Sequence, residues 1–325
     1  MITDYVSEAL RLFPLRQPAA ELIRHNENMT YKVTDGDKRY VLRIHKPVKG
    51  FSLEMLGTVY SKAGLIRNEL AILSVLRQDT AIPLQNPVAG GNGEVLQILA
   101  DGTPVTLLSW VDGQTLRKTE RTNELLFNCG MLMAEMHSCF ARQSSAEKQY
   151  ERYHYDQSLL PSIANRIEQA ARYGALTRGH EQAIQGAFHE MRRRFDELDA
   201  ICGKQIVHAD MNDDNIIVGT DGRLTPIDFS LCGYSHVYFD ISYVFGLDGH
   251  DGVKRRHFIE GYKSVSGFEP SLRYIEPYLA LGVLLFIAGQ YERAKDWDWF
   301  PGAMERWCRD TFMPLVENKA FLEIP

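Results

Sequence analysis

The chain has 325 residues, of which 45% are hydrophobic and 24% are charged, and it carries a formal net charge of -6 at pH 7. This is the composition of a globular protein with enough apolar material for two domains. The negative charge, with no basic stripe to match a phosphate backbone, argues against a dedicated nucleic-acid binder, so we expect no nucleic-acid partner.

Residues 20–110 carry the pattern of a small α+β domain. Runs rich in strand-forming residues at 29–33 and 39–44 flank one turn, and runs at 94–100 and 104–110 flank a second. Between the two hairpins, apolar residues at three- and four-residue spacing over 65–76 predict one helix.

The second half of the chain has a helical pattern. Four segments show apolar residues at helical spacing: 125–140, 158–172, 181–199 and 272–289. The polar region 143–157 is expected to be a mobile connection. A turn follows the last N-terminal strand, so we predict two domains, 1–110 and 111–325, with a cleft between them of the kind that ligands prefer.

No segment of the sequence predicts a membrane or secretory protein. The most apolar segment, residues 278–289, is too short to cross a bilayer, which needs about 20 apolar residues, and we expect it to be a buried helix. No basic stretch precedes an apolar one at the N-terminus, so no signal peptide is expected. The five cysteines show no close pairing motif and fit reduced thiols. These features predict a cytoplasmic protein with no membrane partner.

One strand–loop–hairpin unit, residues 206–228, interrupts the helical half. Two short apolar runs flank Asp221 and Gly222, which are a strong signal for a two-residue hairpin loop. In that register Asn215 falls directly opposite Asp228. Directly opposed side chains have Cβ atoms about 5 Å apart, close enough for their oxygen atoms to share a magnesium ion.

Asp210 lies on the loop that enters the same site and would add a further carboxylate. Two alternatives stay open. A bulge or a longer turn would shift the register by one residue and turn one of the two side chains to the other face. The unit could also be an ordinary surface hairpin with acidic flanks.

The same residues carry a resemblance to a known family. His208, Asp210 and Asn215 follow the pattern His-x-Asp-x-x-x-x-Asn, and Asp228 lies in the sequence Ile-Asp-Phe. This pair of motifs resembles the aminoglycoside phosphotransferase and choline kinase group, the protein-kinase-like phosphotransferases of small molecules. The order of elements is similar over nearly the whole chain. The resemblance implies an α+β, bilobal protein-kinase-like fold, with a small β-rich nucleotide-binding lobe followed by a larger, mainly helical catalytic lobe.

The resemblance also implies roles for individual residues. Asp210 would be the catalytic base, which accepts or orients the proton of the acceptor hydroxyl. Asn215 and Asp228 would hold Mg²⁺ on the phosphates of ATP, because magnesium prefers oxygen ligands. His208 and Asp240 would be structural and would support the catalytic loop. The implied cofactors are ATP and Mg²⁺.

In the N-terminal domain, Arg43 stands where the family has a strand lysine, and Glu69 matches the ion-pair partner of that lysine. Arginine is a planar, bidentate donor, and it can still bridge Glu69 and a phosphate oxygen; the alternative is an arginine that faces solvent. No Gly-rich loop is present, so Asn28 and nearby backbone amides are the candidate phosphate contacts. Ser109 and Val111 lie in a segment that resembles the hinge, whose backbone would pair with adenine.

We therefore predict an ATP- and Mg²⁺-dependent phosphotransferase that acts on a hydroxyl group of a small molecule, such as an amino alcohol, a sugar or an aminoglycoside. Acidic residues near the expected cleft favour a cationic acceptor: Asp210, Asp213, Asp214, Asp228, Asp248 and Asp251. Two alternatives stay open, a Ser/Thr protein kinase of the same fold and a nucleotide-binding regulator without catalysis. Ser230, where protein kinases carry glycine, counts against the first, and retention of the base counts against the second.

Overall fold

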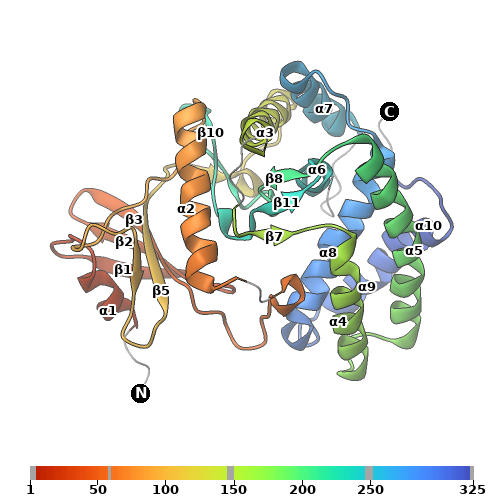
Figure 1. Cartoon of the computed structure of the whole chain (residues 1–325), viewed down its shortest axis with the longest axis horizontal. Coiled ribbons are helices and arrows are strands. Elements are labelled where there is room, and N and C mark those ends of the chain that lie inside the picture. Colours follow the sequence, from red (N-terminus) through yellow and green to blue (C-terminus); the bar gives the residue numbers. More distant parts are fainter. Residues whose placement is uncertain (1–4, 58–59, 145–149, 246–251, 323–325) are drawn as a thin grey trace.

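The computed structural model describes residues 5–57, 60–144, 150–245 and 252–322. They form two lobes, a smaller one built on a sheet at the left of Figure 1 and a larger, mainly helical one at the right. The elements of the N-terminal lobe are α1 (Tyr5–Arg11), β1 (Ala19–His25), β2 (Met29–Asp35), β3 (Lys38–Ile44), α2 (Lys62–Asp79), β4 (Leu96–Ile98) and β5 (Pro104–Ser109).

The C-terminal lobe contains the longer helices and six short strands. Its helices are α3 (Asn123–Ser144), α4 (Leu160–Arg172), α5 (Arg178–Ile201), α6 (Tyr238–Val244), α7 (Gly252–Ser266), α8 (Leu272–Ala294), α9 (Phe300–Trp307) and α10 (Met313–Val316). Its strands are β6 (Gln114–Thr115), β7 (Tyr153–His154), β8 (Gln205–Val207), β9 (Ile216–Val218), β10 (Leu224–Pro226) and β11 (Gly233–Ser235). This arrangement confirms the predicted α+β class and the two lobes.

The N-terminal sheet has one apolar and one polar face. Its strand order is β1-β2-β3-β5-β4, and all neighbouring strands are antiparallel. Leu42 and Ile44 of β3 are fully buried in a small core with Ala9 of α1. Successive side chains of a strand point to opposite faces, so Arg43 points the other way, where it meets Glu69 of α2. The polar face is therefore the one turned toward α2 and the C-terminal lobe.

Helix α8 is the centre of the C-terminal lobe, and α4, α5 and α6 pack against it. By length and composition α8 could cross a membrane, but 67% of its most apolar window is buried inside the protein. The segment 278–289 is thus the buried core helix that its sequence predicts.

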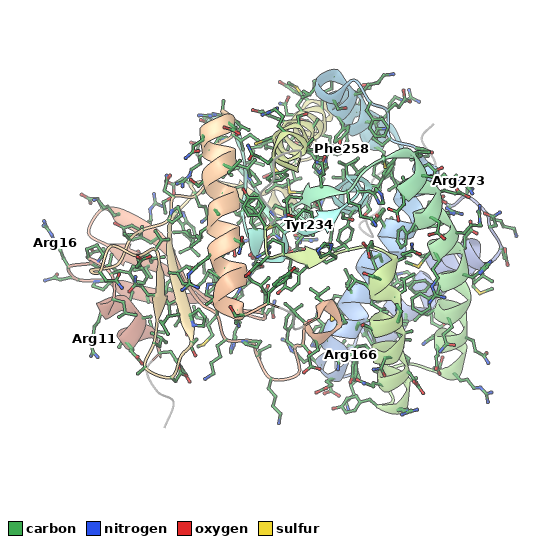
Figure 2. All side chains as sticks on the ribbon, in the orientation of Figure 1. Arg11, Arg16, Arg166, Tyr234, Phe258 and Arg273 are labelled. Atoms are coloured by element: carbon green, nitrogen blue, oxygen red, sulfur yellow. The ribbon has the colours of Figure 1, made fainter. Side chains whose placement is uncertain are left out.

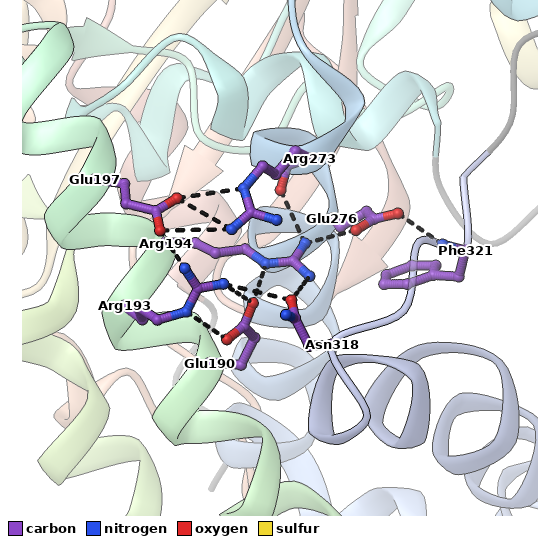
Figure 3. Close-up of polar contacts among 8 residues, drawn as sticks. All are labelled: Glu190, Arg193, Arg194, Glu197, Arg273, Glu276, Asn318 and Phe321. Atoms are coloured by element: carbon purple, nitrogen blue, oxygen red, sulfur yellow. Dashed lines mark hydrogen bonds and ion pairs between the residues drawn. The ribbon is translucent and has the colours of Figure 1, made fainter.

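A buried ion-pair network attaches the end of the described chain to α8 (Figure 3). Arg194 of α5 donates to Glu190 at 2.7 Å and to Glu276 of α8 at 2.6 Å. The second carboxylate oxygen of Glu276 accepts the backbone N–H groups of Phe321 and Leu322 at 2.7 and 3.1 Å. Buried charges need such partners, and the partners of the Glu276 carboxylate are the Arg194 guanidinium and the backbone of residues 321 and 322.

Strands β7, β11 and β8 form a small sheet in the C-terminal lobe, to the right of α2 in Figure 1. Tyr234 of β11, labelled in the middle of Figure 2, stacks on His154 of β7 with ring centroids 5.0 Å apart. The Tyr234 hydroxyl accepts the backbone N–H of Tyr150 at 2.9 Å. This sheet leads directly into the segments that carry the motif residues.

Two features differ from the sequence prediction. The pattern of residues 19–25 does not predict β1, because the strand is almost wholly exposed and lacks alternation. The region 143–157 is expected from its sequence to be a mobile connection, yet within its described part Arg152 and Tyr155 are fully buried.

The predicted boundary between residues 110 and 111, where the strand-rich pattern gives way to a helical one, falls between β5 and β6.

Candidate active site

The hairpin β9–β10 has a different register from the predicted one. Ile216 pairs with Pro226 and Val218 with Leu224, and the Gly219 N–H donates to the Arg223 carbonyl at 2.9 Å. The loop is therefore residues 220–222, three residues and not two. Gly222 adopts a positive φ of 79° in this loop, as three-residue hairpins require. The prediction that Asn215 lies directly opposite Asp228 is therefore wrong by one residue.

The one-residue shift places Ile227 opposite Asn215, and the Ile227 N–H donates to the Asn215 carbonyl oxygen at 2.9 Å. A shift of one would normally turn Asp228 to the other face. Asp228, however, has a left-handed backbone, with φ 66° and ψ 65°. Strained backbone of this kind is concentrated at functional sites, and here it accompanies an aspartate whose side chain still reaches the cleft between the lobes.

Asp210 and Asn215 form a directly bonded pair. The Asn215 Nδ2 donates to Asp210 Oδ2 at 2.8 Å and to the Asp210 carbonyl at 2.9 Å, and Asn212 donates to Asp210 Oδ1 at 2.7 Å. With the amide in this orientation, Asn215 Oδ1 is buried and has no hydrogen-bond partner among the described residues. A buried amide oxygen without a partner is an open ligand position.

The carboxyl group of Asp210 has a pKa well above its ordinary value. Burial, followed by the negative charge of Asp228, raises the pKa of Asp210 to about 7. A general base works best when its pKa lies near the working pH. The influence of Asp228 also means that the two carboxylates share one site.

Two arginines hold Asp228. Arg43 approaches Asp228 Oδ1 at 3.2 Å, an ion pair without the angle of a hydrogen bond, and Arg24 contacts Oδ2. Arg43 also donates to Glu69 at 3.0 Å, and its side chain is only 5% exposed, so the alternative of a solvent-facing Arg43 is wrong. Burial opposes ionisation of Asp228, but the charges of Arg43 and Arg24 outweigh it and lower the pKa of this carboxyl.

Asp240 of α6 holds the loop that carries Asp210 through hydrogen bonds to the loop backbone. The carboxylate of Asp240 accepts the backbone N–H groups of His208 and Ala209 at 2.8 and 2.7 Å. Ala209 has a positive φ of 62°, which costs energy for a residue with a Cβ and is held by these bonds. The His208 ring contacts the Ile227 carbonyl at 3.0 Å, and burial lowers its pKa. The structural roles expected for His208 and Asp240 are confirmed.

The residues expected to contact the nucleotide base and phosphates lie at the end of β5 and at the start of β2. Ser109 ends β5, and its carbonyl already accepts a bond from Gln85 at 3.0 Å, which leaves one further acceptor position on that oxygen. In the part of the chain that the structure describes, the Val111 backbone N–H has no hydrogen-bond partner. Asn28 is buried, with an unbonded Oδ1. Their contacts with nucleotide stay predictions.

Two of the acidic residues expected to attract a cationic acceptor already have arginine partners. Asp213 is buried against Arg121, and Asp214 pairs with Arg117 at 2.8 Å. Both carboxylates are thus already neutralised, and the expectation that they meet a cationic substrate is not supported by their contacts. Two others, Asp248 and Asp251, lie outside the described residues.

Three site residues have no sequence motif that could have identified them. Glu27, in the β1–β2 loop, accepts a hydrogen bond from the Ser230 hydroxyl at 2.9 Å, and burial, followed by the charge of Asp228, raises its pKa to about 7. Arg24 lies three residues earlier on β1. A cavity of about 360 Å³ adjoins Glu27 and is lined, among others, by Lys62, Tyr153 and Ser230.

Arg152 is the third such residue. Its guanidinium is almost completely buried and donates to the carbonyls of Leu65 at 2.7 Å, of Cys232 at 2.6 Å and of Phe229 at 3.3 Å, and to that of Ser230. One side chain therefore ties α2 to the segment that follows Asp228.

Comparison with known proteins gives a consistent picture. A family model described as the phosphotransferase enzyme family matches residues 19–272. Among solved structures, a microcompartment-associated aminopropanol kinase is 19% identical, with a TM-score of 0.77 over 97% of this chain and 98% of that one.

Two further structures extend the comparison. An amicoumacin kinase in complex with AMP-PNP, Ca²⁺ and Ami is 16% identical, with a TM-score of 0.73 over 100% and 96% of the two chains. A spectinomycin phosphotransferase in complex with ADP and spectinomycin is 13% identical, with a TM-score of 0.62 over 94% and 92%. A search of curated proteins finds no match. At these identities the solved structures establish the fold, which is the predicted bilobal, kinase-like one.

Proposed function

The chain belongs to the phosphotransferase enzyme family, and on this premise we propose that it transfers the γ-phosphate of ATP, with Mg²⁺, to a hydroxyl group of a small molecule. Membership of this family sets aside the protein-kinase and non-catalytic alternatives. The observation that carries the finer proposal is the Asp210–Asn215 pair, in which a base with a pKa of about 7 is bonded to an amide whose oxygen is free. We place the reaction in the cytoplasm, where ATP is available.

Asp210 would receive the proton of the acceptor. The hydroxyl oxygen forms a bond to the γ-phosphorus, the bond from that phosphorus to the bridging oxygen of ADP breaks, and the hydroxyl proton passes to Asp210. Phosphoryl transfer asks the protein mainly for positioning and charge neutralisation. The hydrogen bonds from Asn212 and Asn215 leave both Asp210 oxygens in fixed positions, which suits a base that must meet one hydroxyl.

The residues at the site fit a magnesium ion. Asn215 Oδ1 and Asp228 Oδ1 are both buried without a hydrogen bond, and both are hard oxygen donors of the kind that Mg²⁺ takes. Among the described residues no three His, Cys, Asp or Glu side chains form a metal cluster, so the remaining ligands would come from nucleotide phosphates and water. Bound Mg²⁺ would neutralise the charge that develops on the transferred phosphoryl group.

We propose a small amino alcohol as the acceptor. Glu27 faces the cavity of about 360 Å³ beside Ser230, and among the described residues it has no ion pair. A carboxyl group held in this way is stabilised as an anion if a cationic amine enters the cavity. The similar aminopropanol kinase supports the same class, and the amicoumacin kinase and spectinomycin phosphotransferase support a small-molecule acceptor.

The acceptor proposal is tested with a matched pair of alcohols. We expect Glu27→Gln to raise KM for 1-amino-2-propanol about tenfold, the value of one charge-assisted contact, and to leave KM for the neutral 1,2-propanediol unchanged. Asp214→Ala, which removes an exposed carboxylate of the catalytic loop already paired with Arg117, is the control. Equal effects of Glu27→Gln on both alcohols would show that Glu27 does not recognise the amine.

A further inference from the structure

Arg24 owes its position to a defect in strand β1. The pairing of β1 with β2 is regular up to Leu22 and Tyr31, and then shifts by one residue so that Arg24 lies opposite Thr30. Without the shift Ile23 would occupy that place. β-bulges re-aim side chains and are frequent next to active sites, and this one exchanges an apolar side chain for a guanidinium.

The shifted register sets Arg24 in a row with Arg43. Thr30 of β2 is opposite Arg24 on one side and opposite Arg43 of β3 on the other. Directly opposed residues share one face of a sheet, so both arginines point to the face turned toward Asp228. The contacts agree, since Arg43 approaches Asp228 Oδ1 and Arg24 contacts Oδ2.

The two arginines are held very differently. Arg43 is 5% exposed and has a second carboxylate partner in Glu69. Arg24 has a side chain that is 43% exposed, and within the described residues Asp228 is its one carboxylate partner. If the charge balance at Asp228 changes, Arg24 is therefore the residue that is free to move.

A divalent cation cannot approach Asp228 without changing that balance. The carboxylate already faces two positive side chains, and a third cation would be repelled by both at short range. The polyanionic triphosphate of a nucleotide removes the conflict, because a guanidinium binds phosphate oxygens in the same bidentate geometry as carboxylate oxygens.

We propose that Arg24 is a phosphate-binding residue that occupies the metal-binding carboxylate of Asp228 until nucleotide arrives and then passes to the triphosphate. This inference rests on the proposed function. It gives strand β1, which leads into a loop without a Gly-rich sequence, a side-chain contact to phosphate. It also makes metal binding dependent on nucleotide, since Asp228 Oδ2 becomes free and one of the two facing positive charges is removed when Arg24 leaves.

The test compares Arg24→Ala, Arg24→Lys and wild type as full-length proteins, with Arg172→Ala as the control. Arg172 is an exposed arginine on α4 whose one ion-pair partner among the described residues is Glu168 on the same helix. Two equilibria are measured without turnover, the binding of Mn²⁺ alone by the electron paramagnetic resonance signal of the free ion, and the binding of AMP-PNP with Mg²⁺ by calorimetry. The kcat and KM for ATP are measured in parallel.

The inference predicts changes of opposite sign. Arg24→Ala should bind Mn²⁺ alone at least threefold more tightly, because Asp228 is released, and should bind AMP-PNP with Mg²⁺ about tenfold more weakly, because one charge-assisted contact is lost. KM for ATP should rise more than kcat falls, and Arg24→Lys should recover part of the nucleotide affinity. Arg172→Ala should behave as wild type.

The contrary outcomes are distinct. If the affinity for Mn²⁺ is unchanged or falls in Arg24→Ala, Arg24 does not keep the metal from Asp228. If the affinity for AMP-PNP is unchanged, Arg24 does not bind phosphate. If wild type binds and turns over ATP but Arg24→Ala matches it, only the Arg24 inference fails. If wild type binds no nucleotide, the proposed function fails and this inference fails with it.

Discussion

Replacement of Arg152 should destabilise the protein more than replacement of any exposed arginine. The guanidinium is one of the largest fully buried side chains, and it donates to four backbone carbonyls, one on α2 and three in the segment 229–232. Burial opposes its charge, but neighbouring groups including Glu69 more than compensate and raise its pKa, so it is a buried cation with carbonyl partners. Arg152→Ala would remove these four bonds, although the Phe229 carbonyl would still accept the Cys232 N–H.

The size of the effect follows from these contacts. A buried polar group that loses its partner costs about 1–3 kcal/mol. Arg152 lines the cavity of about 360 Å³, however, so water can donate to some of the four carbonyls in its place. We expect about 4 kcal/mol in the free energy of unfolding, similar to the removal of one partner of a buried charge pair. For a chain of 325 residues, with an entropy of unfolding of about 2.1 cal/mol/K per residue, that corresponds to a fall in Tm of roughly 6 °C. Arg152→Lys, with a compact ammonium that cannot reach all four oxygens, should lose about half as much.

Differential scanning fluorimetry of Arg152→Ala, Arg152→Lys and the control Arg172→Ala measures the shift. Activity at a temperature where all variants are folded measures the second consequence, because the segment after Asp228 loses its tie to α2. We expect kcat to fall at least tenfold in Arg152→Ala, because small displacements of catalytic groups slow a reaction by large factors. A Tm within about 3 °C of wild type, with unchanged kcat, would refute the reasoning.

Three further predictions use other parts of the structure. Because the pKa of Asp210 is raised to about 7 and the base acts deprotonated, kcat/KM should fall about tenfold per pH unit below that value; Glu27→Gln should keep this limb of the pH profile and Asp210→Asn should abolish it. Asn215→Ala removes an open oxygen ligand and two bonds to Asp210, so the Mg²⁺ concentration for half-maximal rate should rise about 10–100-fold, and an unchanged requirement would exclude Asn215 as a ligand. Glu276→Gln leaves Arg194 with one buried carboxylate fewer, so calorimetry should find a loss of about 2–4 kcal/mol; an unperturbed Tm would contradict it.

The sequence was sufficient for the parts of the fold that local patterns govern. The strands β2, β3 and β5 follow from runs of strand-forming residues around turns, and the helices α2 and α8 follow from their apolar residues. Fixed spacing also selected Asp210 and Asn215, which lie side by side because both belong to one short loop.

The parts that could not be predicted depend on contacts between distant segments. The register of β9 and β10 differs by one residue because Gly222 extends the loop, and the left-handed backbone of Asp228 has no sequence signal in a non-glycine residue. Arg152 follows a polar stretch, and only its four carbonyl partners from distant segments explain its burial. Arg24 needs a bulge that no pattern in β1 announces.

The most direct test of the central claim is transfer of labelled γ-phosphate from ATP to 1-amino-2-propanol by wild type, Asp210→Asn and Asp214→Ala. We predict Mg²⁺-dependent formation of the phosphorylated amino alcohol by wild type and by Asp214→Ala, and a rate at least a hundredfold lower for Asp210→Asn, the usual contribution of a general base. Product formation by Asp210→Asn at the wild-type rate would contradict the assignment of Asp210. Release of free phosphate alone, across amino alcohols, sugars and aminoglycosides, would contradict the proposed phosphotransfer itself.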